Sequence, residues 1–261
     1  MSAPDIFASP LYWPLRPWLA QLPPHPDAGA VATLAERHPI VDSNGRRIRF
    51  VPPRPDGLAY ECRIGESGEV ETRPDNWHDW FNALVWLSFP HTKLAISARH
   101  VQAMTPAGVA RGSERDVLTH FDECGIVVLS SRPELLDLLR GFQWKTLFVA
   151  RRAEVERHMR FIVLGHATYE ALLKPFRGLT AKAVLHEVDG ACLRLPVAEQ
   201  PAAVDARLAA ELTSGHYARP RDFQPLPLLG IPGVTPKNAD PAYYDDPWQF
   251  RPGRRATKKA A

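Results

Sequence analysis

The chain has 261 residues, of which 45% are hydrophobic, and a formal net charge of +3 at neutral pH. A chain of this length and composition can bury a core large enough to fold without a disulfide or a structural metal. Its three cysteines lie far apart and form no C-x-x-C pair, which argues against a structural zinc site and fits a reducing, cytoplasmic compartment. We expect a single-domain α+β protein in which a small antiparallel sheet packs with several helices.

The two ends of the chain differ in composition from its body. Residues 1–26 are rich in proline and lack a basic signal-peptide start, so they should run as an extended wrap over a domain of residues 27–235. No apolar run reaches the roughly 18 to 20 residues that a membrane-spanning helix needs. The net positive charge lies entirely in residues 236–261, which we expect to be a disordered polar tail. We therefore expect no membrane insertion, and no nucleic-acid binding beyond a weak tether through this tail.

The first predicted elements are strands. Asn44-Gly45 is typical of a turn, and RIRFV follows it as a strand. The segments LAYECRI and EVETR flank the glycine-containing residues 65–68 and indicate a hairpin. Together they predict a small antiparallel sheet near the start of the domain.

A helix follows over residues 77–89, where Asp75 or Asn76 can cap its start and Pro90 ends it. This helix is apolar on nearly all sides and should lie at the centre of the fold. A less regular helix over residues 93–104 comes next.

A second clear helix begins at a capping-box pattern, Ser113 with Asp116, and ends at Gly125. The apolar run IVVLS after it predicts a strand. We favour one long helix over residues 154–173, although Gly165 could instead mark a turn between a strand and a helix. The other expected elements are a helix over 133–140, a strand or helix over 144–150, a strand near 182–188 and a helix near 201–213.

The segment TRPDNWHDWFNALVWLSFPHTK carries the first group of candidate site residues. It places His78, Asp79 and Asn82 in the first turns of an apolar helix, where each needs a polar partner. His78 could act as a general base or a metal ligand, since the helix start favours its neutral form. It could equally bond a loop carbonyl in a purely structural role.

The segment SERDVLTHFDECG supplies two polar faces of the next helix. Arg115, Thr119 and Asp122 share one face, and Asp116, His120 and Glu123 share the adjacent one. These faces indicate either a catalytic or metal-binding wall or an ordinary solvated surface with ion pairs.

Further candidates lie elsewhere in the chain. In GHATYE, a helix would place His166 and Glu170 four residues apart, a spacing at which two side chains can share a metal or a proton. The cations Arg73, Lys93 and Arg115 would suit an anionic small-molecule substrate, or could neutralise nearby carboxylates. A divalent metal is a candidate cofactor, but the chain carries no glycine-rich phosphate loop, G-x-S-x-G or H-E-x-x-H motif.

The four segments TRPDNWHDWFNALVWLSFPHTK, RDVLTHFDECG, GHATYE and LPLLGIPG, in this order, resemble a bacterial family of domains of unknown function, DUF3025. The resemblance spans nearly the whole chain and implies no particular activity, cofactor or substrate. The family pattern has Asn near the position of Ser97, ahead of His100, which is a further candidate site residue. A hydroxyl in place of an amide argues against direct catalysis by Ser97.

Two classes of function remain open. One is a hydrolase or transferase acting on an anionic or phosphorylated small molecule, with His78 as base or ligand and Asp116, Asp122 and Glu123 as acids or ligands. The other is a binding or assembly protein whose polar clusters are structural. A metal-dependent nuclease is a minor alternative, because Asn82 and His91 have the spacing of H-N-H fingers although the upstream histidine is too close. If these residues meet in one cavity, the enzyme is favoured, and Asp116→Asn and Asp122→Asn should not destabilise the protein.

Overall fold

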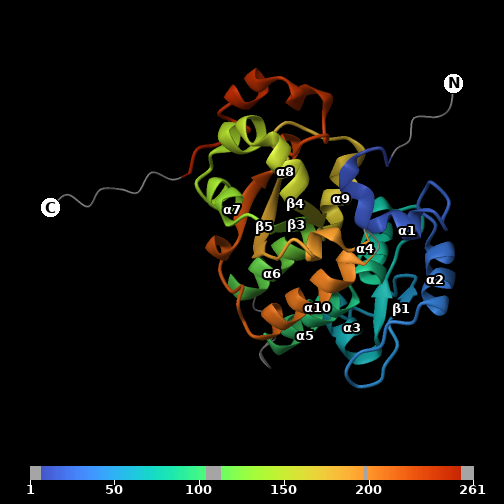
Figure 1. Cartoon of the computed structure of the whole chain (residues 1–261). Helices are drawn as coiled ribbons and strands as arrows, with labels where there is room; N and C mark the ends of the chain where they lie inside the picture. The colour runs from blue at the N-terminus through green and yellow to red at the C-terminus, as the bar shows by residue number, and fades with distance from the viewer. Residues whose placement is uncertain (1–6, 104–112, 197–198, 254–261) are drawn as a thin grey trace, which may run out of the picture.

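The computed structural model describes residues 7–103, 113–196 and 199–253. Helices surround one four-stranded sheet and one two-stranded sheet (Figure 1). The strands are β1 (Arg49–Val51), β2 (Glu69–Glu71), β3 (Gly125–Ser130), β4 (Met159–Val163), β5 (Thr180–Glu187) and β6 (Gln224–Pro227). The α-helices are α1 (Arg16–Leu19), α2 (Ala28–Arg37), α3 (Tyr60–Ser67), α4 (Trp77–Ser88), α5 (Pro90–Gln102), α6 (Ser113–Cys124), α7 (Pro133–Arg140), α8 (Arg152–His158), α9 (His166–Leu173) and α10 (Gln200–Thr213).

The larger sheet has the strand order β4-β3-β5-β6. Its central strand β3 is the predicted IVVLS strand, and all of its residues are buried. Val127 of β3 lies opposite Ile162 of the antiparallel β4 and opposite Val184 of the parallel β5. A strand covered on both faces needs a continuous apolar run, which explains why the sequence here does not alternate.

Helix α4 lies at the centre of the fold, as its sequence predicts. Asn76 caps it, because its side chain accepts a hydrogen bond from the backbone of Asp79 at 2.9 Å. The indoles of Trp80 and Trp86 are only 1% exposed. The helix packs against α5 and α9, so it connects the elements that carry most candidate site residues.

The smaller sheet differs from the expected hairpin. Strands β1 and β2 pair in parallel, with Phe50 opposite Val70, and the segment LAYECRI between them contributes to helix α3. Gly68 ends this helix with a φ of 69°, in the left-handed conformation typical of a helix C-terminus. The prediction of a hairpin was therefore wrong, because this glycine belongs to a helix end and not to a β-turn.

The segment from residue 152 to 173 is not one long helix. It forms helix α8, strand β4 and helix α9, with Gly165 at the turn before α9. The antiparallel pairing with β3 overrides the helical periodicity of this stretch. Residues 146–150 form a turn of π-helix. The segment over residues 144–150, for which the sequence allowed a strand or a helix, is therefore helical.

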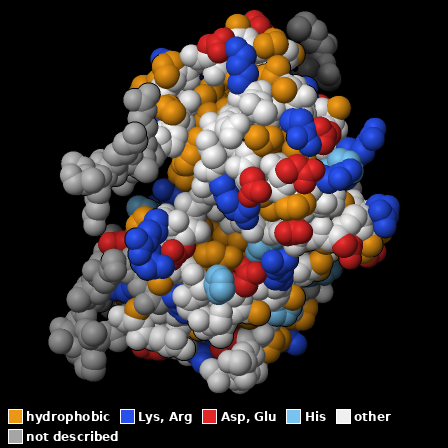
Figure 2. Space-filling model, turned by 60° about the vertical axis from the view of Figure 1, so that its left-hand side comes forward, with side chains coloured by type: hydrophobic (Ala, Val, Ile, Leu, Met, Phe, Trp, Pro, Cys, Tyr) orange, Lys and Arg blue, Asp and Glu red, His pale blue; other side chains and the backbone are white. Residues whose placement is uncertain are grey.

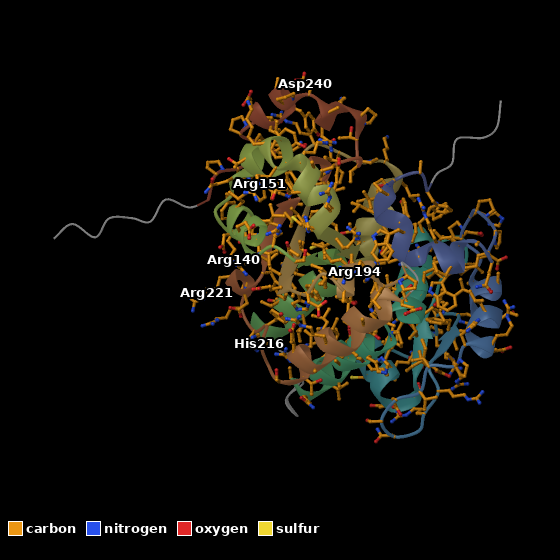
Figure 3. The ribbon with its side chains drawn as sticks, in the orientation of Figure 1. Arg140, Arg151, Arg194, His216, Arg221 and Asp240 are labelled. Carbon is orange, nitrogen blue, oxygen red and sulfur yellow. The ribbon has the colours of Figure 1, made fainter. Side chains whose placement is uncertain are left out.

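Both ends of the described chain pack on the body. Residues 10–15 form a 3-10 helix that buries Leu11, Tyr12 and Leu15, where an extended wrap was expected. After residue 235, Tyr244 and Phe250 are buried with ring centroids 4.8 Å apart, so residues 236–253 belong to the folded body. Figure 3 shows Asp240 of this segment at the same end of the molecule as Arg151. Residues 254–261 of the expected tail lie outside the described residues, as does the side chain of Ser113 in the expected capping box.

On the face drawn in Figure 2, side chains of both charges are interspersed. Among the described helices, none is both long enough and apolar enough to span a bilayer. The described residues thus fold into a single α+β domain.

Candidate functional site

A cavity of about 410 Å³ opens between helices α3, α4, α6 and α9. His78, Asp116 and Asp122, which come from two of these helices, all line it. The three side chains whose convergence would favour an enzyme thus line one cavity. A volume of a few hundred cubic ångströms is typical of a small-molecule site.

Most of the predicted site residues line this cavity. They are Arg73, His78, Asp79, Asn82, His100, Arg115, Asp116, Asp122, Glu123 and His166. Two others stand around it: Lys93 lies behind Asp122, and Glu170 contacts His78. Helix α6 contributes one wall, since Arg115, Thr119 and Asp122 follow each other at helical spacing.

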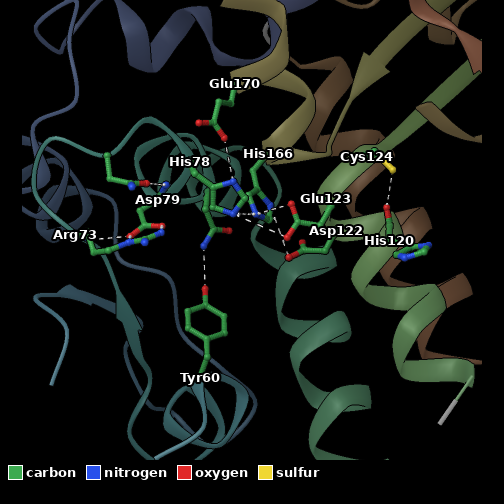
Figure 4. Close-up of polar contacts among 12 residues, drawn as sticks. Tyr60, Arg73, His78, Asp79, His120, Asp122, Glu123, Cys124, His166 and Glu170 are labelled. Carbon is green, nitrogen blue, oxygen red and sulfur yellow. Dashed lines mark hydrogen bonds and ion pairs between the residues drawn. The ribbon is translucent and has the colours of Figure 1, made fainter. Parts of the chain in front are cut away.

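Two histidines and a glutamate converge beside this wall (Figure 4). The Nε2 atoms of His78 and His166 lie 3.1 Å apart. The Glu123 carboxylate lies 3.5 Å from Nε2 of His166 and 3.9 Å from Nε2 of His78. Three potential ligand atoms from α4, α6 and α9 thus lie within 4.8 Å of one another.

A close backbone approach brings His166 to this position. Gly165 precedes α9 and lies against the end of α6, where an added Cβ would come within 2.4 Å of the Glu123 carbonyl oxygen and the Cys124 Cα. The backbone amides of residues 164 and 165 both donate to the Gly125 carbonyl. Only glycine permits this approach, which sets the first residue of α9 beside the last turn of α6.

Carboxylates lie behind both imidazoles. Nδ1 of His78 lies 3.2 Å from Oε2 of Glu170, and Nδ1 of His166 lies 3.7 Å from Oδ2 of Asp122. The buried Nδ1 of His166 has no hydrogen-bond partner within the described residues. Burial lowers the pKa of His166 to about 3, so the ring is neutral at physiological pH and retains a lone pair for a ligand.

Asp122 also belongs to a buried ion pair. Nζ of Lys93 donates to both carboxylate oxygens of Asp122, at 2.6 and 2.7 Å, and to Oδ1 of Asn82 at 2.9 Å. Asn82 in turn donates to the Tyr60 hydroxyl at 2.8 Å. Burial favours the neutral acid, but the attraction of Lys93 prevails and lowers the pKa of Asp122. This network fixes the side chains of Asp122 and Asn82. Lys93 is engaged by both of them and is not among the residues that line the cavity.

The cavity wall contributed by α3 includes Glu61, which the sequence did not suggest as a site residue. Burial, aided by the charge of Asp122, raises the pKa of Glu61 to about 7. Its Oε1 lies 4.0 Å from Nε2 of His100, whose pKa burial lowers to about 4. The helix-ending Gly68 was the signal that could have placed Glu61 in the first turn of a helix.

Several predicted groups have structural partners. Arg73 donates hydrogen bonds to the Asp79 carboxylate from its backbone amide, Nε and Nη2, at 2.8 to 2.9 Å. The charges of these two residues therefore neutralise each other. His91 lies away from the cavity and bonds Asp205, which does not support the H-N-H alternative. Ser97 is buried and is not among the residues that line this cavity.

The His78, His166 and Glu123 cluster has the donors and the spacing of a divalent metal site. Tetrahedral zinc with N and O ligands at about 2.0–2.2 Å separates neighbouring ligand atoms by about 3.3–3.6 Å. The two Nε2 atoms lie 3.1 Å apart, and Oε2 of Glu123 lies 3.5 Å from Nε2 of His166, both close to that value, whereas Oε1 of Glu123 lies 3.9 Å from Nε2 of His78. Histidine ligands of metals commonly direct their second nitrogen to a carboxylate, the position that Glu170 and Asp122 occupy here.

Comparison with known proteins identifies a family of this chain but assigns no activity to that family. Residues 48–254 match the model of a family described as a protein of unknown function, DUF3025. No curated protein and no solved structure matches the chain. The match covers well over half of the sequence, including every residue of the histidine and glutamate cluster. The chain therefore belongs to the DUF3025 family.

Proposed function

We propose that this protein is a metal-dependent hydrolase for an anionic small molecule, and that His78, His166 and Glu123 hold its metal. The observation that carries the proposal is the convergence of two Nε2 atoms and a carboxylate at the edge of a cavity of about 410 Å³. Two histidines and a glutamate, with one coordination position left for water, form a ligand set of zinc hydrolases.

The chain's own residues have distinct tasks in this proposal. A bound divalent ion would supply a water of lowered pKa and polarise the substrate. Glu170 holds Nδ1 of His78, which directs Nε2 of that ring toward His166. Lys93 fixes the carboxylate of Asp122 behind Nδ1 of His166. This carboxylate, 3.7 Å from Nδ1, can therefore orient the imidazole while it stays bound to Lys93.

Glu61 is the candidate general base. It lines the same cavity, and a carboxyl group with a pKa of about 7 can take and release a proton at neutral pH. Asn82 and Tyr60 form a hydrogen-bonded pair between α4 and α3, beside this group, and supply neutral polar contacts for a substrate.

The test is a hydrolysis screen with metal reconstitution. Protein freed of metal by a chelator is assayed against anionic esters, amides and phosphoesters, without metal and after addition of Zn²⁺, Mn²⁺ or Co²⁺. We expect activity only with metal. His78→Ala and Glu123→Gln should lose at least about 100-fold, since even residues behind metal ligands change activity by about 10- to 100-fold.

Two variants serve as matched controls. His216→Ala removes an exposed histidine at a distance from the cavity, and Glu156→Gln removes an exposed carboxylate, so both should retain full activity. Hydrolysis that persists in the absence of metal, or that survives Glu123→Gln, would contradict the proposal. Metal-free and inactive protein would favour the alternative of a binding or assembly protein.

A further inference from the structure

Arg115 is a buried arginine of the cavity wall with guanidinium nitrogens that lack a hydrogen-bond partner among the described residues. It lies on α6, lines the cavity and is only 8% exposed. Its Nε and Nη1 atoms are buried without a hydrogen-bond partner among the described residues. Leaving buried guanidinium N–H donors without an acceptor is unfavourable, so an anion that accepts from Nε and Nη1 would stabilise this site.

The other charged groups of the cavity do not supply that anion. Three of the lining carboxylates already have a cation: Asp79 binds Arg73, Glu71 pairs with Arg63, and Asp122 pairs with Lys93. Glu123 belongs to the metal-ligand cluster. Glu61 and Asp116 line the cavity, but neither forms an ion pair with Arg115 within the part of the chain that the structure describes. Arg115 therefore remains available to a ligand.

The position of Arg115 defines where this ligand lies. Arg115 and Glu123 are eight residues apart on the same helix, which corresponds to about 12 Å along its axis. Both side chains open into one cavity, with His100 and Glu61 on the walls between α5 and α3. The first turn of a helix also carries the positive end of its dipole, which adds to the attraction of Arg115 for an anion.

The surrounding charges select the kind of anion. A single carboxylate would be neutralised by the single guanidinium. A phosphate dianion would bring a second negative charge next to Glu61 and Asp116, with no second free cation among the described lining residues. His100 is a buried, neutral imidazole whose Nδ1 lacks a hydrogen-bond partner within the described chain, so it can offer a hydrogen bond without adding charge.

We propose that Arg115, with His100 nearby, forms a carboxylate-binding subsite at the far end of the cavity from the metal cluster. The substrate is then a small carboxylic acid. Its carboxylate lies at Arg115, and the bond that is hydrolysed lies at the other end of the cavity, beside the metal cluster. The assignment of a hydrolysed bond rests on the proposed function, whereas carboxylate binding at Arg115 does not require the metal.

The experiment uses full-length, metal-free protein and three probes: butyrate, its uncharged analogue butyramide, and inorganic phosphate. Binding is followed by thermal shift and by ligand-observed NMR at low ionic strength and neutral pH. We expect butyrate to bind and to raise the melting temperature, butyramide to have no effect, and phosphate to bind more weakly than butyrate. Arg115→Gln should weaken butyrate binding at least tenfold, whereas Arg140→Gln, which removes an exposed arginine outside the cavity, should not change it.

The variants separate this inference from the proposed function. Glu123→Gln should lose metal yet keep butyrate binding, and Arg115→Gln should keep metal. Equal butyrate binding by wild type and Arg115→Gln, or tighter binding of phosphate than of butyrate, would overturn the carboxylate subsite and leave the metal centre untouched. If Arg115→Gln does not fold, Arg115→Lys replaces it, because it keeps the charge without the planar fork and should bind butyrate measurably more weakly than wild type.

Discussion

Replacing Asp122 by Asn should destabilise the protein, because it removes the partner of a buried lysine. Lys93 is 4% exposed in its side chain, and both oxygens of Asp122 accept its hydrogen bonds at 2.6 and 2.7 Å. Breaking a buried ion pair from one side costs about 3–5 kcal/mol. Asn82 remains an acceptor for Lys93, and the Asp122 carboxylate is 17% exposed, so we expect the lower end, about 3 kcal/mol. This result would reverse the expectation drawn from the sequence that Asp122→Asn leaves stability unchanged.

The measurement is urea unfolding followed by circular dichroism at neutral pH in metal-free buffer. Asp122→Asn, Lys93→Met and the double variant form a double-mutant cycle that isolates the pairwise interaction. The double variant should be more stable than Asp122→Asn, since it no longer leaves an unpaired ammonium buried. Asp116→Asn is the control, because Asp116 is exposed and forms no ion pair among the described residues. A loss below about 1 kcal/mol for Asp122→Asn would refute the role assigned to the Lys93 pair.

Three further changes test other parts of the structure. Glu61→Gln should be more stable than wild type above pH 7 by up to about 3 kcal/mol. Because the folded pKa of about 7 exceeds the unfolded value, wild type loses stability as the pH rises from 4.5 through 7, so a pH-independent difference in urea unfolding would contradict this. Trp86→Ala should cost about 3–5 kcal/mol in denaturant unfolding, and a loss below about 1 kcal/mol would mean that α4 is peripheral. Phe250→Ala should cost about 3 kcal/mol, and an unchanged melting temperature would show that residues 236–253 do not belong to the core.

Much of the site's location follows from helical spacing alone. His78 and Asn82 share one face of an apolar helix, and the polar residues of α6 repeat at intervals of three and four. Polar groups on such helices must meet partners, so the sequence predicts that they face a common polar space. It cannot predict which atoms face which, because Lys93 pairs with Asp122 across two helices whose relative placement depends on the whole core.

The parts that the sequence did not predict depend on contacts between distant segments. The run MRFIV is short enough for either strand or helix, and its pairing with β3 decides the matter. Once β4 is a strand, Gly165 becomes the tight approach to α6 that sets His166 beside His78. Glu61 was missed for a related reason, since Gly68 fits a hairpin turn and a helix end equally well until β1 and β2 are seen to be parallel.

The central claim is that His78, His166 and Glu123 hold a divalent metal. The most direct measurement is the metal content of protein purified without an affinity tag, determined by mass spectrometry after dialysis against Zn²⁺ and removal of free ions. We predict a single tightly held ion in wild type and in His216→Ala, and at least a tenfold loss of affinity in both His78→Ala and Glu123→Gln. Wild-type protein that retains no metal, or variants that retain as much as wild type, would contradict the account.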